Sequence, residues 1–132
     1  MSKIKLIKAG KVVNDILSTN EGLAEIVGTK IYPIGIISGE PQYPYIVFER
    51  MNLILSDTKD YTPYGERCWI KIYCFDKKYN NVIDLADKVV DIMLHLQGTY
   101  DDIAISNISF VGVEEAMNND AFVEILTFDM QI

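Results

Sequence analysis

The only histidine of the chain is the side chain best suited to acid or base chemistry near neutral pH. His95 follows Asp91 by four residues on the polar side of a predicted helix, so the two resemble a general base and the carboxylate that orients it. No serine or cysteine lies in a local setting that would make it a nucleophile for this base. A solvated helix face explains the pair better, and we predict no catalytic residues.

The two cysteines, Cys68 and Cys74, are six residues apart in one predicted strand. At about 3.3 Å per residue they are separated by about 20 Å. This distance is too long for a disulfide and for ligands that share a tetrahedral zinc ion. We therefore expect two buried, reduced thiols, as in cytosolic proteins, and no zinc or redox-metal site.

Two acidic doublets and one glycine-containing segment are the other candidates for ligand binding. Asp101-Asp102 and Glu114-Glu115 carry oxygen ligands that suit a hard cation, but neither doublet lies in a loop with EF-hand spacing. Solvated turns and edges explain both doublets better. The segment IGIISGE matches neither a dinucleotide-binding fingerprint nor a phosphate-binding loop, because its glycine spacing is wrong and no Lys-Ser/Thr pair follows. No cofactor is predicted.

Length and composition predict one globular domain over residues 1–132. Hydrophobic residues make up 49% of the chain and charged residues 23%, which is the ordinary globular range. The net charge of −7 disfavours nucleic-acid binding as the main function, because binding phosphates needs clustered cations. Neither an export signal nor an apolar run long enough to cross a membrane is visible, so we expect a soluble protein that stays where it is made.

Apolar residues three and four positions apart predict helices in two parts of the chain. Thr19 or Asn20 can cap the second helix, and Gly28 ends it in the position typical of a left-handed stop. Gly98 is expected to end the third helix. The predicted helices are Lys5–Leu17, Glu21–Val27 and Asp76–Leu96.

Runs of β-branched and aromatic residues predict strands that turns separate. The polar segment Leu55–Gly65 joins two strands as a long hairpin with a protruding tip, and a turn at Asn118-Asn119-Asp120 forms a second hairpin. A further turn is expected at Thr99–Asp102. Hairpins with helices between them indicate an α+β fold of two layers, with a mainly antiparallel sheet of about four to five strands and helices packed on one face. The predicted extended segments are Lys30–Ile37, Tyr45–Ile54, Glu66–Phe75, Ile103–Glu114 and Ala121–Gln131.

The central predicted strand is apolar on both faces. Trp69, Tyr73 and Phe75 lie on one face, and two cysteines and two isoleucines lie on the other. If the helices cover the cysteine face, the aromatic row is an exposed patch of the kind that meets a partner. The alternatives are that the helices cover the aromatic face or that the sheet curls. Tyr61 and Tyr64 in the hairpin tip are further candidate interface residues, with solvated loop aromatics as the alternative.

Three segments follow one another in an order that carries more information than any single motif. They are ILSTNEGLAEIVGTKIYP (Ile16–Pro33), PQYPYIVFE (Pro41–Glu49) and WIKIYCFDKKYNNVIDLADKVVDIM (Trp69–Met93). A helix leads into a VG…IYP segment, a PYIV strand start follows, and a second strand precedes a helix rich in Ala and Val. In this order the chain resembles the small phage tail-completion family of tail-terminator or head-tail joining proteins. It departs from the family in its long Asp57–Gly65 hairpin and its extended closing hairpin.

The resemblance implies a structural virion protein without enzyme activity. Members of the family cap the end of a tail tube as a ring, commonly sixfold, and join the tube to the head. The implied partners are further copies of this chain, the tail tube protein and the head-tail connector protein. The implied location is the head-tail junction of the virion, with assembly in the host cytoplasm. Since a channel that DNA slides through should not bind it, we predict that Asp57, Asp60 or Glu66 lines the channel and repels phosphates.

A function of another class stays open. The chain would then be a small cytosolic binding module or enzyme, with a pocket between the helices and the sheet near His95 and Asp101-Asp102. Such a pocket needs convergent polar groups, whereas the polar residues of this sequence are scattered.

Overall fold

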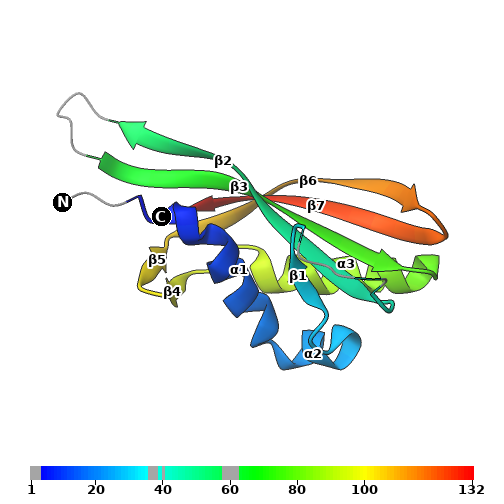
Figure 1. The fold of residues 1–132 in the computed structure, drawn as a ribbon. Coiled ribbons are helices and arrows are strands. Elements are labelled where there is room, and N and C mark those ends of the chain that lie inside the picture. Colours follow the sequence, from blue (N-terminus) through cyan, green and yellow to red (C-terminus); the bar gives the residue numbers. More distant parts are fainter. Residues whose placement is uncertain (1–3, 36–38, 40, 58–62) are drawn as a thin grey trace.

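The computed structural model describes residues 4–35, 39, 41–57 and 63–132. Its main sheet has five strands in the order β1-β2-β3-β7-β6, and three α-helices lie against one face of it (Figure 1). β1 is parallel to β2, and the other pairings in this sheet are antiparallel. The predicted two-layer α+β fold is therefore confirmed. The strands are β1 (Ile31–Pro33), β2 (Tyr45–Asp57), β3 (Pro63–Asp76), β6 (Asn107–Asn118) and β7 (Ala121–Gln131).

The two N-terminal helices form close to the predicted positions. The first begins as one 3₁₀ turn, η1 (Leu6–Lys8), and continues as α1 (Ala9–Ser18). α2 (Glu21–Val27) is capped by Asn20, whose Oδ1 accepts a hydrogen bond of 2.9 Å from the backbone N–H three residues later. Gly28 ends α2 with a φ of 62°, which glycine adopts without steric cost. Local sequence is enough to place these helix ends.

α3 (Tyr79–Met93) buries its predicted apolar stripe but ends before the predicted stop at Gly98, which belongs to a strand instead. Leu94 is extended, with φ −66° and ψ 127°, and His95 is left-handed, with φ 60°. The N–H of His95 donates to the carbonyl of Ile108 at 2.7 Å, so a contact with β6 draws the chain away from the helix. No helix in the described part of the chain is long and apolar enough to cross a membrane.

The segment predicted as a single strand, Ile103–Glu114, is two strands in two sheets. β4 (Gly98–Tyr100) and β5 (Ile103–Ile105) form a separate two-stranded sheet before β6 begins. Between β5 and β6, Ser106 donates its backbone N–H (2.9 Å) and its hydroxyl (3.0 Å) to the carbonyl of Gln131. The turn predicted over residues 99–102 is therefore shorter than predicted. Strands of three residues are too short for alternation to reveal them.

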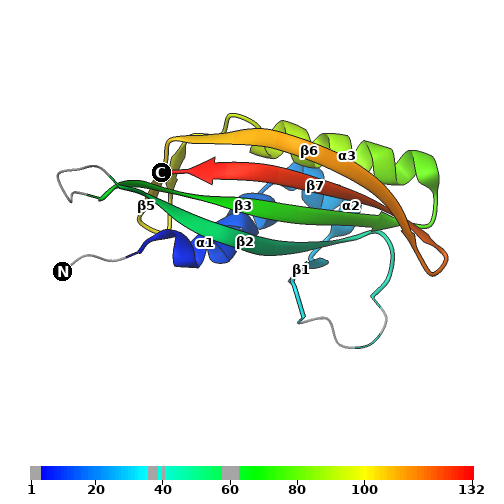
Figure 2. The same cartoon turned by 90° about the horizontal axis from the view of Figure 1, so that it is seen from above.

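Both predicted hairpins form. β2 and β3 pair antiparallel, and β6 and β7 are joined by a tight turn in which Asn119 has a φ of 58°. At this second turn asparagine tolerates the left-handed backbone better than most residues. The hairpins place β3 and β7 side by side in the middle of the sheet, with β2 and β6 outside them (Figure 2).

The core lies between the helices and one face of the sheet. Cys68, Ile70, Ile72 and Cys74 of β3 point into it and are almost fully buried. The aromatic side of β3 is consequently the outer one, toward the viewer in Figure 2, and the alternative in which the helices cover that side is wrong. Both cysteines are free thiols, and burial raises the pKa of Cys68 to about 11, which keeps this thiol protonated and unreactive.

Ile72 tests which face of β3 holds the core together. The side chain is fully buried between α1, α3 and the sheet, so Ile72→Ala should lower the free energy of unfolding by about 2–5 kcal/mol. Lys71→Ala, on the outer face of the same strand, should change it by less than about 0.5 kcal/mol. Urea denaturation measures both. Equal losses for the two variants would contradict this assignment of faces.

Candidate assembly surfaces

The aromatic residues on the outer face of β3 differ in exposure. Trp69 is 47% exposed, Tyr73 is half-buried and Phe75 is only 9% exposed. Phe75 stacks on Tyr45 of β2 with ring centroids 4.4 Å apart, and the Tyr73 ring is 6.5 Å from that of Phe75. The predicted row thus packs largely on itself, and Trp69 is its most available member. Tyr73 and Phe75, but not Trp69, belong to a cluster on the outer face, here called the outer aromatic cluster. Its members are Tyr32, Tyr43, Tyr45, Val47, Tyr73, Phe75, Val123 and Ile125.

Trp69 lies beside an irregularity in β2. The register of β2 against β3 shifts between Arg50 and Leu53, as at a β-bulge. An exposed tryptophan beside a groove, on a sheet face that no helix covers, is typical of a contact with another protein. The groove, here called the Trp69 groove, has a volume of about 420 Å³ and is lined by Met51, Asn52, Arg67, Cys68 and Trp69.

A partly buried ion pair lies at one wall of the Trp69 groove. Asp129 of β7 lies directly opposite Trp69 in the pairing of β3 with β7, and its carboxylate pairs with the guanidinium of Arg67. Asp129 is 4% exposed, whereas about half of the Arg67 side chain is in contact with solvent. The pair therefore holds an arginine at the surface, next to the exposed tryptophan.

Of the predicted channel residues, Glu66 has a defined contact. Its two carboxylate oxygens accept hydrogen bonds from the backbone N–H groups of Lys5 (2.8 Å) and Leu6 (2.7 Å). A negative charge is favourable at the N-terminus of a helix, because the first N–H groups of a helix have no partners within it. Glu66 thus anchors η1 to β3. For Asp57 the structure describes only the backbone, at the end of β2, and Asp60 lies outside the described residues.

The two hairpin tyrosines cannot be placed in the same way. Tyr61 lies outside the described residues, and Tyr64 is described by its backbone alone, near the beginning of β3. Their role as interface residues stays a prediction.

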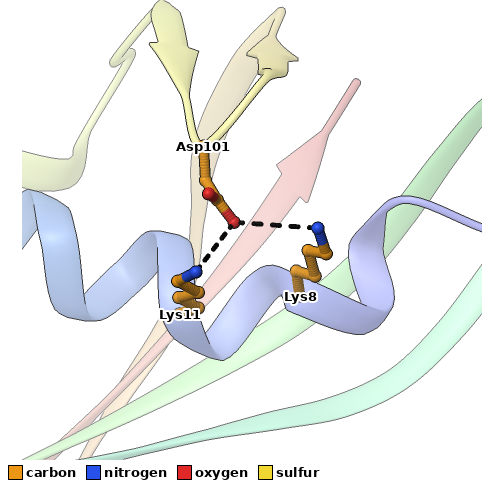
Figure 3. A network of polar contacts seen from close by, with 3 residues as sticks. All are labelled: Lys8, Lys11 and Asp101. Carbon is orange, nitrogen blue, oxygen red and sulfur yellow. Dashed lines mark ion pairs between the residues drawn. The ribbon is translucent and has the colours of Figure 1, made fainter.

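Asp101, one of the two aspartates at the β4–β5 turn, is paired within the chain. Asp101 Oδ2 lies 3.5 Å from the Lys11 ammonium and 4.0 Å from that of Lys8 (Figure 3). This pairing holds the turn against the first helix and already occupies the carboxylate oxygen that a cation would need.

His95 lies beyond the end of α3, so His95 and Asp91 do not lie one turn apart on the same helix face, as the sequence predicts. Within the described ranges, no three His, Cys, Asp or Glu side chains are grouped to hold a metal ion.

The second acidic doublet takes part in a site that the sequence reading missed. Glu115 lies directly opposite Glu124 in the pairing of β6 with β7, and the hydroxyl of Tyr79 in α3 donates to Glu115 Oε2 at 2.5 Å. Glu124 is 8% exposed, and its burial and the charge of Glu115 raise its pKa to about 7. The signal in the sequence is a glutamate flanked on both sides by apolar residues of a predicted strand, from Ala121 to Leu126.

The edge strand β6 presents apolar side chains to solvent. Phe110 is 39% exposed, Val111 45%, Val113 51% and Met117 62%. As the last strand of the sheet, β6 also leaves one row of backbone groups without a strand partner in the described chain. A long edge with exposed apolar residues is suited to association with another chain.

The raised pKa of Glu124 predicts a pH dependence of stability. Between its ordinary value of 4.5 and about 7, the folded chain keeps a proton on Glu124 that the unfolded chain has lost. The contribution of this residue to the free energy of unfolding should fall as pH rises through that range and then level off. Glu124→Gln should remove this contribution and stabilise the chain near pH 8 by on the order of 1 kcal/mol, allowing for solvent screening.

Chemical denaturation at several pH values measures this difference. The matched control is Glu114→Gln. It removes the same charge from an exposed position in β6, next to Glu115. If the stability of Glu124→Gln followed pH as steeply as that of the wild type, Glu124 would not be the group responsible.

Solved structures of two other proteins share this fold. One is a chain of the virion of a native gene transfer agent (GTA) particle, with a TM-score of 0.80 and 17% sequence identity over 96% of this chain and 98% of that chain. The other, which carries no description of a function, has a TM-score of 0.67 and 8% identity over 98% of this chain and 96% of that chain. No protein-family model and no curated protein matches the sequence. At these identities the likeness establishes a common fold over nearly the whole length of the chains.

Proposed function

We propose that the chain is a structural component of a phage-like particle. The observation that carries this proposal is the likeness to a chain of a gene transfer agent virion, at a TM-score of 0.80 over nearly all of both chains. The described residues hold no grouped set of metal ligands, and His95 lies beyond the end of α3, outside the helix that holds Asp91. A non-catalytic role in an assembled particle fits both observations.

Within the particle, we propose that the chain is the tail-completion subunit at the head-tail junction. The sequence resemblance of residues 16–33, 41–49 and 69–93 to the tail-completion family supports this finer role. These segments include α2, β1, the start of β2, most of β3 and α3, so they span both layers of the fold. In this role the chain forms a ring, commonly sixfold, between the tail tube protein and the head-tail connector protein. It needs no cofactor.

Contacts between copies of the chain are proposed to use the outer face of β3. Trp69 and the Trp69 groove supply an exposed aromatic ring beside an indentation, which is the kind of feature that dominates interface energies. Tyr73 and Phe75 continue this surface along the same face of β3, where they pack in the outer aromatic cluster. Tyr61 and Tyr64 of the β2–β3 hairpin are proposed to extend the contact.

The acidic residues of the β2–β3 hairpin are proposed to face the channel. Asp57, Asp60 and Glu66 would place negative charge where DNA passes, and repulsion would keep the phosphates from binding. The carboxylate of Glu66 is held in one position by hydrogen bonds from two backbone N–H groups, which supports the idea of a charge at a fixed place.

Deletion of the gene from a strain that makes the particles tests the function. We expect particles without the chain to show heads and tails that are not joined, or tails of irregular length, in electron micrographs. A plasmid copy of the wild-type gene should restore joined particles, and mass spectrometry of purified particles should detect the chain. Joined, normal particles from the deletion strain, or the absence of the chain from purified particles, would contradict the proposal.

Trp69→Ser tests the surface between copies. Loss of an exposed aromatic anchor should weaken self-association at least about tenfold, because such anchors carry about 2 kcal/mol or more of interface energy. Lys71→Ser, two residues away on the same outer face, should assemble like the wild type. Light scattering over a wide concentration range measures the native mass, and a wild-type species near six subunits is expected. A Trp69→Ser variant that assembles normally would remove this residue from the interface.

A further inference from the structure

Two carboxylates face each other at the end of the sheet where α3 begins. Glu115 of β6 and Glu124 of β7 are a directly opposed pair, and like charges in this position destabilise a sheet. The hydroxyl of Tyr79 donates a hydrogen bond to Glu115 Oε2, which stabilises this carboxylate without removing its charge. None of the ion pairs found among the described residues involves either glutamate. The pair therefore carries negative charge that the described chain does not balance.

Glu124 is also an unfilled hydrogen-bond acceptor. Only 8% of the residue is exposed, and its Oε2 has no hydrogen-bond partner within the described part of the chain. A buried carboxylate oxygen without a partner is costly, and native proteins rarely keep one without a reason. Glu124 also lines a small pocket. Its Oε2 has less than 1 Å² of accessible surface, so the carboxylate must rotate to present this oxygen to a group in the pocket.

The pocket combines the two carboxylates with apolar walls. Its volume is about 230 Å³, which is below the usual range for cofactors and drug-sized ligands. The rings of Tyr79 and Phe122 meet edge to face with centroids 5.3 Å apart, and Met117 is 62% exposed at the rim. The site, here called the Glu115–Glu124 pocket, is lined by Tyr79, Glu115, Ala116, Met117, Phe122 and Glu124.

This lining suits an organic cation better than a metal ion. Calcium takes six to eight oxygen ligands, whereas two carboxylates and one phenol face this pocket, and its other walls are apolar. A lysine or arginine side chain has a methylene stem that packs on apolar and aromatic groups, and a cationic head that donates hydrogen bonds to carboxylates. In this pocket the stem would pack on Phe122 and Met117, and the cationic head would meet the carboxylates of Glu115 and Glu124.

The surroundings of the pocket favour a protein as the source of that side chain. Val113, Glu115 and Met117 alternate along the same face of β6, so the rim of the pocket continues into an exposed apolar stripe on the edge strand. A single free amino acid would leave this stripe in water, whereas a protein surface covers it as the basic side chain enters.

We propose that the Glu115–Glu124 pocket receives a lysine or arginine side chain from a neighbouring protein chain that lies along the exposed flank of β6. This inference rests on the proposed function in one respect, that the neighbour is another protein of the particle. The entering cation hydrogen-bonds to the carboxylates of Glu115 and Glu124 and balances their negative charge.

Binding should depend on pH, because only an ionised Glu124 attracts the cation fully. The groups that face Glu124 are Glu115 from β6, Tyr79 from α3 and Cys74 from β3. Burial raises the pKa of the Cys74 thiol far above neutrality, and the bond to Glu115 raises that of Tyr79, so neither loses its proton in the working range. With the pKa of Glu124 at about 7, affinity for the cation should rise between about pH 6 and pH 8.

The first test uses the purified full chain and Nα-acetyl-L-arginine methylamide as the probe. NMR titration near pH 8 should give saturable shifts in the amides of Tyr79, Met117 and Phe122, and the affinity should fall several-fold near pH 6. Glu124→Gln should weaken binding about tenfold or more, and Glu114→Gln, its matched charge control, less than about twofold. Absent saturation, equal effects of the two variants, or saturation by Ca²⁺ but not by the probe would each overturn the proposal.

The second test uses particles and separates this inference from the proposed function. The double variant E115Q/E124Q should enter particles at least several-fold less than the wild type, and Glu114→Gln should enter normally. Normal incorporation of the double variant would overturn the pocket as a contact while leaving the role in the particle intact. If the wild-type chain itself is absent from particles, the proposed function fails, and the probe titration still decides whether the pocket binds a cationic side chain.

Discussion

The burial of the inner face of β3 is the constraint on which the rest of the structure depends. β3 has a hydrogen-bonded neighbour on each side, and its cysteines and isoleucines fill the space beneath α1 and α3. Because side chains alternate along a strand, committing this face to the core sends Trp69, Tyr73 and Phe75 to the opposite side. The outer aromatic cluster and the Trp69 groove follow from that choice.

Local patterns in the sequence predict the parts of the fold that local contacts determine. The cap at Asn20, the stop at Gly28 and the hairpin turn at Asn119 each depend on residues within a few positions, and the structure confirms them. The errors occur where distant residues decide. The end of α3 depends on a hydrogen bond from His95 to β6, and the break before β6 depends on Ser106 reaching the last strand. Neither partner is visible in a local window.

For the candidate surfaces too, local sequence predicts some features, and contacts between distant residues determine the others. The inner and outer sides of β3 could be assigned from alternation, but the mutual packing of Phe75 and Tyr45 could not, since it joins two strands across a hairpin. The Glu115–Glu124 pocket was missed for a related reason. From the sequence alone, Glu115 is interpreted as a solvated charge at the edge of the sheet. Only the register of β6 against β7 shows that Glu124 lies opposite it, and only the folded sheet buries Glu124. A glutamate flanked by apolar residues is the one hint that sequence offers.

Glu66 joins the two ends of the described chain. Its carboxylate accepts hydrogen bonds from Lys5 and Leu6, and its backbone carbonyl accepts one from the N–H of Ile132 at 3.0 Å. Next to it Gly65 approaches the Ile132 carbonyl so closely that an added Cβ would lie 2.8 Å from that oxygen. The two ends therefore share one pole of the molecule, and the β6–β7 turn occupies the other (Figure 1). A fluorescent or affinity tag at either end would mark the same pole, so its position in an electron density map of an assembly would show which way each subunit points.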